Sequence, residues 1–195
     1  KKDHIKLINY CKKKKIKFLS TAFDLESLEF LIKKCKIDCI KIPSGEITNL
    51  PLLEKAASLK KKIFLSTGMS NLKEISLAIK ILNKNGCKSK NITVLHCITN
   101  YPAAPEELNL AVIKLLKKKF KINVGYSDHS LGILAPIIAV SYGASVIEKH
   151  FTLNKNFEGP DHKASLEPDE LKKMIENIKN ASLMIGKELK ILSQA

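Results

Sequence analysis

The sequence contains neither tryptophan nor arginine, and all 34 of its basic side chains are lysines. Nucleic-acid sites depend on the bidentate hydrogen bonds of arginine and on aromatic rings for stacking. The formal charge of +15 therefore reflects a bias towards lysine, and we expect no nucleic-acid partner. No apolar run is long enough to span a bilayer, and the lysine-rich opening residues lack the apolar centre of a signal peptide. We therefore expect no membrane partner either.

The cysteines also show no pattern of disulfide pairing. The 5 cysteines form an odd set and contain no C-x-x-C pair, a pattern that favours reduced thiols. We therefore expect a cytoplasmic protein without disulfide bonds.

Apolar strand-like segments alternate with amphipathic helical segments along the chain, and no change of composition marks a domain boundary. Six short strands are expected, at 17–20, 39–42, 63–66, 92–96, 122–126 and 144–149. Strands that alternate with helices predict an α/β fold with a parallel sheet. Because a (β/α)8 TIM barrel needs eight strands and this chain opens with a helix, we expect a barrel lacking its first two βα units. An open, doubly wound sheet is the alternative, which the absence of a glycine-rich loop after any strand makes weaker.

Two histidines follow neighbouring expected strands. His129 comes after the strand at 122–126, and His150 comes after the strand at 144–149, with an apolar helical segment between them. In a parallel sheet or barrel both strand ends open on the same face, so the two imidazoles can converge. Neutral imidazoles with open coordination positions suit a catalytic divalent cation, and Asp128 and Glu148 are candidate partners for the two rings. A lone histidine at a strand end is more often structural, and only the pair indicates a metal site.

Polar side chains also follow the other expected strands, at the face where barrel enzymes have their active sites. Loops are polar in any protein, so each residue needs its own argument. The candidates are Ser20 and Thr21; Lys41, Ser44, Gly45 and Glu46; Ser66, Thr67 and Gly68; and the segment from His96 to Tyr101.

Five motifs in order along the chain resemble the sialic acid synthase family, whose members make N-acetylneuraminate, legionaminate and related sugars. They are KIPSGE (41–46), LSTGM (65–69), LHC with NYP (95–102), GYSDHS (125–130) and EKHFT with GPDH (148–162). The family fold is a (β/α)8 barrel followed by a small antifreeze-like domain. The resemblance implies that residues 1–195 are a partial TIM-barrel catalytic domain with strands 3 to 8, and that the antifreeze-like domain is absent.

The resemblance implies a transferase that condenses phosphoenolpyruvate with an N-acetylated hexosamine and releases phosphate. The sugar would be N-acetylmannosamine or a 2,4-diacetamido relative. The family uses a divalent cation, Mn²⁺ first with Mg²⁺ or Co²⁺ as alternatives, and the resemblance gives His129 and His150 as its ligands. It also implies a homodimer for the full-length enzyme.

Lys41 and Glu46 are the other two catalytic candidates. Lysine between two isoleucines must point somewhere unusual, and the resemblance assigns Lys41 to the phosphoenolpyruvate anion. A Schiff-base lysine is the competing interpretation, because aldolases of this fold place a lysine at a strand end. The resemblance makes Glu46 the general base or proton carrier when water adds to phosphoenolpyruvate, whereas its alternative role is a charge at a helix N-terminus.

The remaining candidates would bind substrate. Hydroxyl groups can contact phosphate and carboxylate oxygens, although each can also cap a helix. Which of Thr99 and Asn100 makes the polar contact stays open, and Asp161 could be a turn former rather than a ligand of the sugar hydroxyls. The substrate-binding set is Thr21, Lys41, Ser44, Ser66, Thr67, Thr99, Asn100, Tyr101, Ser127 and Asp161.

Two other classes of function remain open. One is a different phosphoenolpyruvate-condensing or Schiff-base aldolase barrel that acts through Lys41. The other is a catalytically silent barrel that binds anionic partners through its positive surface.

Overall fold

The computed structural model describes residues 2–187, 189 and 190, so residues 1, 188 and 191–195 of the expected unit 1–195 lie outside the described residues. Within that part, five strands form one parallel sheet in the order β1-β2-β3-β4-β5. This confirms the predicted parallel α/β class. The strands are β1 (Cys39–Ile42), β2 (Lys62–Ser66), β3 (Ile92–Cys97), β4 (Asn123–Asp128) and β5 (Ile147–Lys149).

Helices follow the strands and begin where the sequence offers N-terminal signals. Asp24 caps α2 through the backbone N–H of Ser27, Asn71 and Glu74 form a reciprocal capping box on α4, and Pro168 opens α7. In the described residues no helix is both long and apolar enough to cross a membrane. The helices are α1 (Lys2–Lys13), α2 (Leu25–Lys33), α3 (Leu50–Ser58), α4 (Leu72–Lys84), α5 (Val112–Phe120), α6 (Leu134–Ser141) and α7 (Pro168–Ile185).

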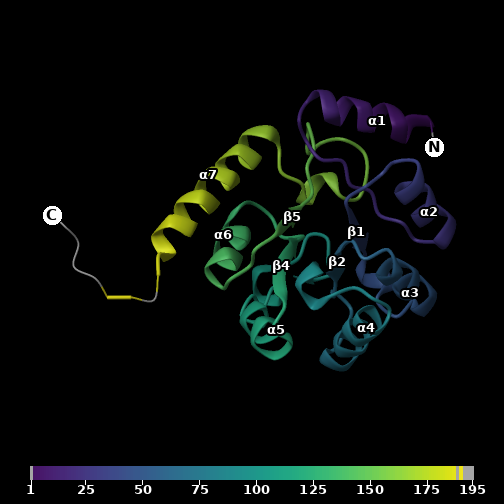
Figure 1. Ribbon diagram of the computed structural model, residues 1–195. Helices are drawn as coiled ribbons and strands as arrows, with labels where there is room; N and C mark the ends of the chain where they lie inside the picture. Colours follow the sequence, from purple (N-terminus) through teal and green to yellow (C-terminus); the bar gives the residue numbers. More distant parts are fainter. Residues whose placement is uncertain (1, 188, 191–195) are drawn as a thin grey trace.

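The sheet is curled. Its strands lie on an arc, and α2 to α6 follow one another along the outer side of that arc (Figure 1). A doubly wound sheet would carry helices on both faces, so that alternative is wrong. The clearest sign of the curl is a contact between the two outermost strands. Lys41 Nζ, on β1, lies 2.6 Å from Glu148 Oε1, on β5. The described sheet is thus an open, barrel-like arc of five strands.

The two faces of the arc differ in chemistry. Paired positions in a parallel ladder point to the same face, and successive residues alternate between faces. The contact between Lys41 and Glu148 identifies the concave face, and the ladder register extends it to Ser66 and Ser127. Isoleucine, leucine and valine dominate the other face, which is buried against the helices. They include Ile40, Ile42, Ile63, Leu65, Ile92, Val94 and Val124.

Two expected elements differ from the structure. The segment 17–20 is not a strand, and the residue after it, Thr21, forms only an isolated bridge with Lys41. It runs along the β1 edge, where Ile16 and Leu19 are both exposed, so the apolar burial that would hold a full ladder is small. The strand expected at 144–149 is shorter in the structure, where β5 covers only Ile147–Lys149.

Gly125 provides a test of the curl. A Cβ there would lie 2.6 Å from Leu95 Cδ2 and 2.6 Å from the Val146 carbonyl oxygen. We expect Gly125→Ala to lower the free energy of unfolding by about 1–3 kcal/mol, because neither the backbone nor the packed leucine can move freely. Chemical denaturation measures the change.

The matched control is Gly45→Ala, because a Cβ at Gly45 meets nothing within 4 Å. It should change the free energy of unfolding by less than about 0.5 kcal/mol. Equal stabilities of the two variants would contradict the close contact inside the arc.

Candidate functional site

Three aromatic rings meet beyond the carboxyl ends of the last three strands. His129 directly follows β4, His150 directly follows β5, and Tyr101 lies in the loop after β3. The two imidazole centroids are 5.5 Å apart. Tyr101 stacks on His129 with centroids 4.0 Å apart and meets His150 edge-on at 5.7 Å. Partial burial, followed by the negative charges of Asp161 and Glu148, raises the pKa of Tyr101, so its phenol stays protonated.

A second cluster lies on the concave face below these rings. Lys41 Nζ donates to both carboxylate oxygens of Glu148, at 2.6 and 2.8 Å, and Ser127 Oγ donates to the same carboxylate at 2.6 Å. Burial would raise the pKa of Glu148, but the Lys41 ammonium and the Ser127 hydroxyl outweigh it and hold that pKa below its ordinary value. The cluster is therefore a charged pair in which the lysine is buried and the glutamate is partly exposed.

Both clusters open on one cavity of about 210 Å³. It is small and polar, as expected for a site that holds charged groups rather than an apolar ligand. Its lining contains Thr21, Lys41, Ser127, Asp128, His129, Glu148, Lys149 and His150. The cavity thus brings together five of the sequence-predicted site residues: Thr21, Lys41, Ser127, His129 and His150.

The ring of His129 is fixed by the backbone. Its Nδ1 is hydrogen-bonded to the carbonyl oxygen of Ile98, which requires the proton on Nδ1 and leaves the lone pair on Nε2. Burial, opposed by that hydrogen bond, lowers the pKa of His129, so the neutral ring is favoured. A neutral imidazole whose other nitrogen donates to a carbonyl is the usual arrangement of a metal-ligating histidine.

The two carboxylates expected to partner the histidines bind lysines instead. Glu148 binds Lys41, and Asp128 binds Lys149 with an Nζ to Oδ2 distance of 2.6 Å. The lysines are stronger partners because they carry a full charge and reach the carboxylates directly. Within the described residues, the one carboxylate paired with either histidine is that of Asp161, whose Oδ2 lies 3.9 Å from His150 Nδ1.

Asp128, which we expected to be a partner of a histidine ring, instead forms a network with Lys149 that we did not predict. The Asp128 and Lys149 side chains are 0% and 2% exposed. Asp128 Oδ1 accepts hydrogen bonds from the Tyr126 hydroxyl and from the backbone N–H and hydroxyl of Ser130, while Lys149 also donates to the Ser130 carbonyl. A signal was present in the sequence, since a charged residue precedes each histidine. The ladder register that pairs Asp128 with Lys149 could not be read from the sequence.

The hydroxyl candidates have different environments. Ser44 Oγ accepts from the backbone N–H of Gly68 at 2.9 Å, and Thr67 donates to the Leu95 carbonyl at 2.9 Å. Ser66 Oγ is buried, and within the described part of the chain it is the one buried side-chain oxygen or nitrogen without a hydrogen-bond partner. A buried unpaired hydroxyl costs free energy, so this position calls for an explanation.

Four further candidates do not line the small cavity. Glu46 accepts a hydrogen bond from Asn49 at 2.6 Å in its own turn. Asn100 donates to Glu107 at 2.7 Å and is exposed, whereas Thr99 is half-buried with its methyl beside Gly68. Asp161 lies in the loop after β5, close to His150.

Metal-ligating residues other than the two histidines are not clustered. Among residues 2–187, 189 and 190 there is no group of three or more histidine, cysteine, aspartate or glutamate side chains that could hold a metal ion. His129 and His150 could therefore supply two ligands to a cation, and its other positions would be open to water or substrate.

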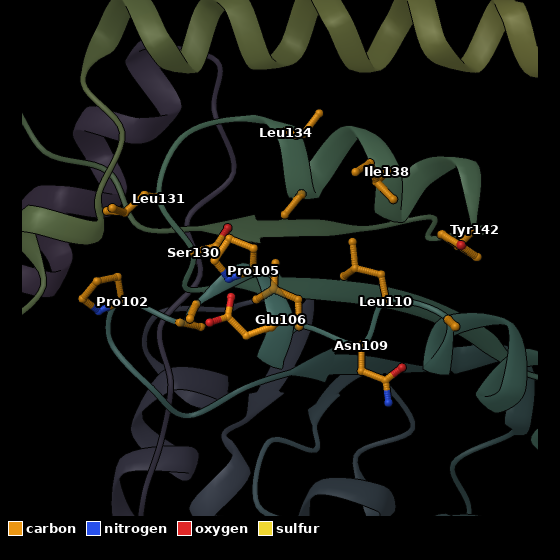
Figure 2. Close-up of a pocket in the computed structure, with 15 residues that line it drawn as sticks. Pro102, Pro105, Glu106, Asn109, Leu110, Ser130, Leu131, Leu134, Ile138 and Tyr142 are labelled. Carbon is orange, nitrogen blue, oxygen red and sulfur yellow. The ribbon is translucent and has the colours of Figure 1, made fainter.

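A larger cavity of about 800 Å³ lies elsewhere, between α6 and the loop at residues 102–111 (Figure 2). Its lining is mainly leucine, alanine and proline, with Glu106 as its one charged side chain. It contains neither histidine and not Lys41, and these three candidates line the smaller, polar cavity.

The chain is similar in sequence to a known protein family and to named synthases. A model described as the NeuB family matches residues 1–190. The chain is 55% identical over 194 residues to N,N'-diacetyllegionaminic acid synthase of Campylobacter jejuni, covering 100% of this chain and 58% of that protein. It is 44% identical over 186 residues to the synthase of the same name from Legionella pneumophila, covering 94% of this chain and 52% of that protein.

A solved structure agrees with these relatives. The crystal structure of N-acetylneuraminic acid (sialic acid) synthetase from Leptospira borgpetersenii, in complex with citrate, superposes with a TM-score of 0.91 at 34% identity. The match covers 98% of this chain and 67% of that chain. The chain spans a little over half the length of the two curated relatives above.

Replacing Lys41 with methionine removes the cation from Glu148. We expect the free energy of unfolding near pH 7 to fall by about 1–2 kcal/mol, less than for a fully buried pair because the Glu148 carboxylate is partly exposed. Since the folded state lowers the pKa of Glu148, this stabilisation is present above the ordinary glutamate pKa and is lost as the pH falls through the lowered one. Urea unfolding from about pH 7 to about pH 3 measures it.

Lys62→Met, at the exposed start of β2, is the control and should change stability by less than about 0.5 kcal/mol. A Lys41→Met effect of the same size at every pH would show that lost packing, and not the ion pair, is responsible.

Proposed function

The chain belongs to the NeuB family, and from that premise we propose that its protein condenses phosphoenolpyruvate with an N-acetylated hexosamine to a nonulosonic acid and releases phosphate. One observation carries the proposal: His129 and His150 converge beside the Lys41–Glu148 pair at the carboxyl ends of the strands. The relatives from Campylobacter and Legionella are both named N,N'-diacetyllegionaminic acid synthase. A 2,4-diacetamido hexose is therefore the first candidate for the sugar, with N-acetylmannosamine second.

A divalent cation held by His129 and His150 is part of the proposal. The neutral His129 ring with its free Nε2 fits such a ligand. Mn²⁺ is the first candidate, with Mg²⁺ and Co²⁺ as alternatives. When bound, it would act as a Lewis acid towards the aldehyde of the open-chain sugar.

Lys41 would bind the phosphoenolpyruvate anion. Its ammonium already meets both oxygens of Glu148, so it is placed to contact a negatively charged group. A Schiff-base lysine must act as a neutral amine, and a bidentate contact with a carboxylate favours the ammonium instead. The geometry therefore supports the anion-binding role over the aldolase alternative.

The hydroxyl groups on the concave side would complete the anion site. Ser66 is the most informative, because its buried Oγ has no partner of its own and a phosphate or carboxylate oxygen would supply one. Ser44, Thr67 and Ser127 lie at neighbouring strand ends and would contact the same anion. Thr21 lines the small cavity from the β1 side.

The sugar and the attacking water would lie towards the loops. Tyr101 and Asp161 flank His150, and with Thr99 or Asn100 they would contact the sugar. Because Asn100 is bonded to Glu107, Thr99 is the better candidate of the two. Glu46 would act as general base or proton carrier, which requires it to leave its contact with Asn49.

The assembly of the whole protein is also proposed. The curl of the sheet supports a closed (β/α)8 barrel in the whole enzyme, to which the described arc would contribute five strands. We propose a homodimer for that enzyme.

The reaction can be tested by phosphate release from phosphoenolpyruvate with each of the two sugars, with and without Mn²⁺. The assay uses this chain and a chimera that carries it between the flanking segments of the Campylobacter relative. Release by the chimera should require both metal and sugar. In the variant carrying His129→Ala and His150→Ala it should fall by at least about a thousandfold, because the cation would lose both protein ligands.

A folded, metal-loaded chimera that releases no phosphate would make the synthase proposal wrong. Borohydride trapping of a carbonyl substrate on Lys41 would then identify a Schiff-base aldolase.

Ser66→Ala should separate stability from binding. Removal of an unpaired buried hydroxyl should leave the free energy of unfolding unchanged or raise it by up to about 1 kcal/mol. The KM for phosphoenolpyruvate should rise by about tenfold, the loss expected for a hydrogen bond to a charged group. Ser58→Ala, an exposed position in α3, is the control and should alter neither quantity. A destabilised Ser66→Ala with an unchanged KM would exclude this role.

A further inference from the structure

The buried pair Asp128–Lys149 lies directly beneath the two histidines. Each partner is the residue before one histidine, and the two occupy paired positions in the β4–β5 ladder. They point to the helix-facing side, away from the Lys41–Glu148 pair, because neighbouring residues in a strand point to opposite faces. The ion pair therefore ties together the two strand ends from which His129 and His150 project.

The same network reaches the loop that carries Tyr101. Lys149 donates to the carbonyl of Ser130, and Ser130 pairs with Ala103 in an isolated parallel bridge. The backbone N–H of Ala103 in turn donates to the carbonyl of His129 at 3.0 Å. Through Ser130, one lysine connects the ends of β4 and β5 with the loop after β3, and these three segments bear the three rings of the site.

Stability alone is a poor explanation for this pair. Burying two charges costs several kcal/mol for each ion, and an apolar pair of similar volume is often at least as stable. The network is nonetheless densely hydrogen-bonded: Asp128 Oδ1 accepts three hydrogen bonds, Oδ2 accepts one from Lys149, and Lys149 donates another to the Ser130 carbonyl. Such a network specifies one geometry, which is what converging ligands need.

We propose that Asp128 and Lys149 are positioning residues that set the separation of His129 and His150, and with it the affinity of the site for a divalent cation. The inference rests on the proposed function, because that function requires the cation. We assign neither side chain a contact with substrate, because both are almost fully buried. Both act through the backbone of the residue that follows them and through Ser130.

A double variant, Asp128→Asn with Lys149→Met, tests the proposal. Each single variant leaves a buried charge without its partner and is expected to unfold the chain or destabilise it strongly. The double variant removes both charges, keeps a similar volume, and leaves an amide oxygen to accept from Tyr126 and Ser130. An exposed ion pair on α1, removed as Asp3→Asn with Lys6→Met, is the control.

Three measurements on the 195-residue chain follow. Mn²⁺ affinity is read from the electron paramagnetic resonance of free Mn²⁺, ligand geometry from the visible absorption of bound Co²⁺, and local opening from amide hydrogen exchange. In the double variant we expect a Kd for Mn²⁺ at least about tenfold higher, the effect typical of lost outer partners of metal ligands. We also expect a changed Co²⁺ spectrum and faster exchange confined to residues 99–103, 128–131 and 149–151.

The unfolding midpoint of the double variant is measured alongside. A parent-like midpoint with weaker metal binding supports positioning. Parent-like metal affinity, Co²⁺ spectrum and hydrogen exchange in the double variant would overturn it. Failure of the proposed function has a different signature: the unmodified chimera would release no phosphate, whatever the exchange pattern of the double variant.

Discussion

The contact between Lys41 and Glu148 is the constraint on which the site depends. In a flat sheet the first and the fifth strand would lie about 19 Å apart, further than a lysine and a glutamate side chain can span. A direct contact between them is possible only because the sheet curls. The curl creates a concave face, collects the strand ends around one cavity, and brings the last two strands with their histidines opposite β1.

The alternation of side chains along each strand then gives the arc two separate ion pairs. Lys41 and Glu148 lie on the concave face, whereas Asp128 and Lys149 lie between the sheet and its outer covering. Glu148 and Lys149 are neighbours in sequence, yet they belong to different pairs because their side chains point to opposite faces. The Lys41–Glu148 pair is partly exposed and can exchange partners, whereas the side chains of Asp128 and Lys149 are almost fully buried and hold the backbone in place.

Much of this could be predicted from the sequence. Local sequence patterns predict the alternation of strands and helices and the helix caps at Asp24 and Asn71. The rules of parallel sheets predict that the two strand ends converge. The partners of Asp128 and Glu148 could not be predicted, because they depend on ladder register and on the curl of the whole sheet, and neither is encoded in a short window. The segment 17–20 was misjudged for a related reason: it has strand-like residues, but little apolar surface to bury at the edge.

The Glu148 carboxylate supplies Lys41 with a counterion from within the chain. Any anion that is to contact Lys41 must therefore compete with a tethered carboxylate that is always present. Binding becomes an exchange of one anion for another, so few salt ions are taken up or released. Its dependence on ionic strength should be shallow compared with that of the lysine-rich surface. Such an exchange also favours a ligand with more than one negative charge, because a single carboxylate would only replace what Glu148 already provides.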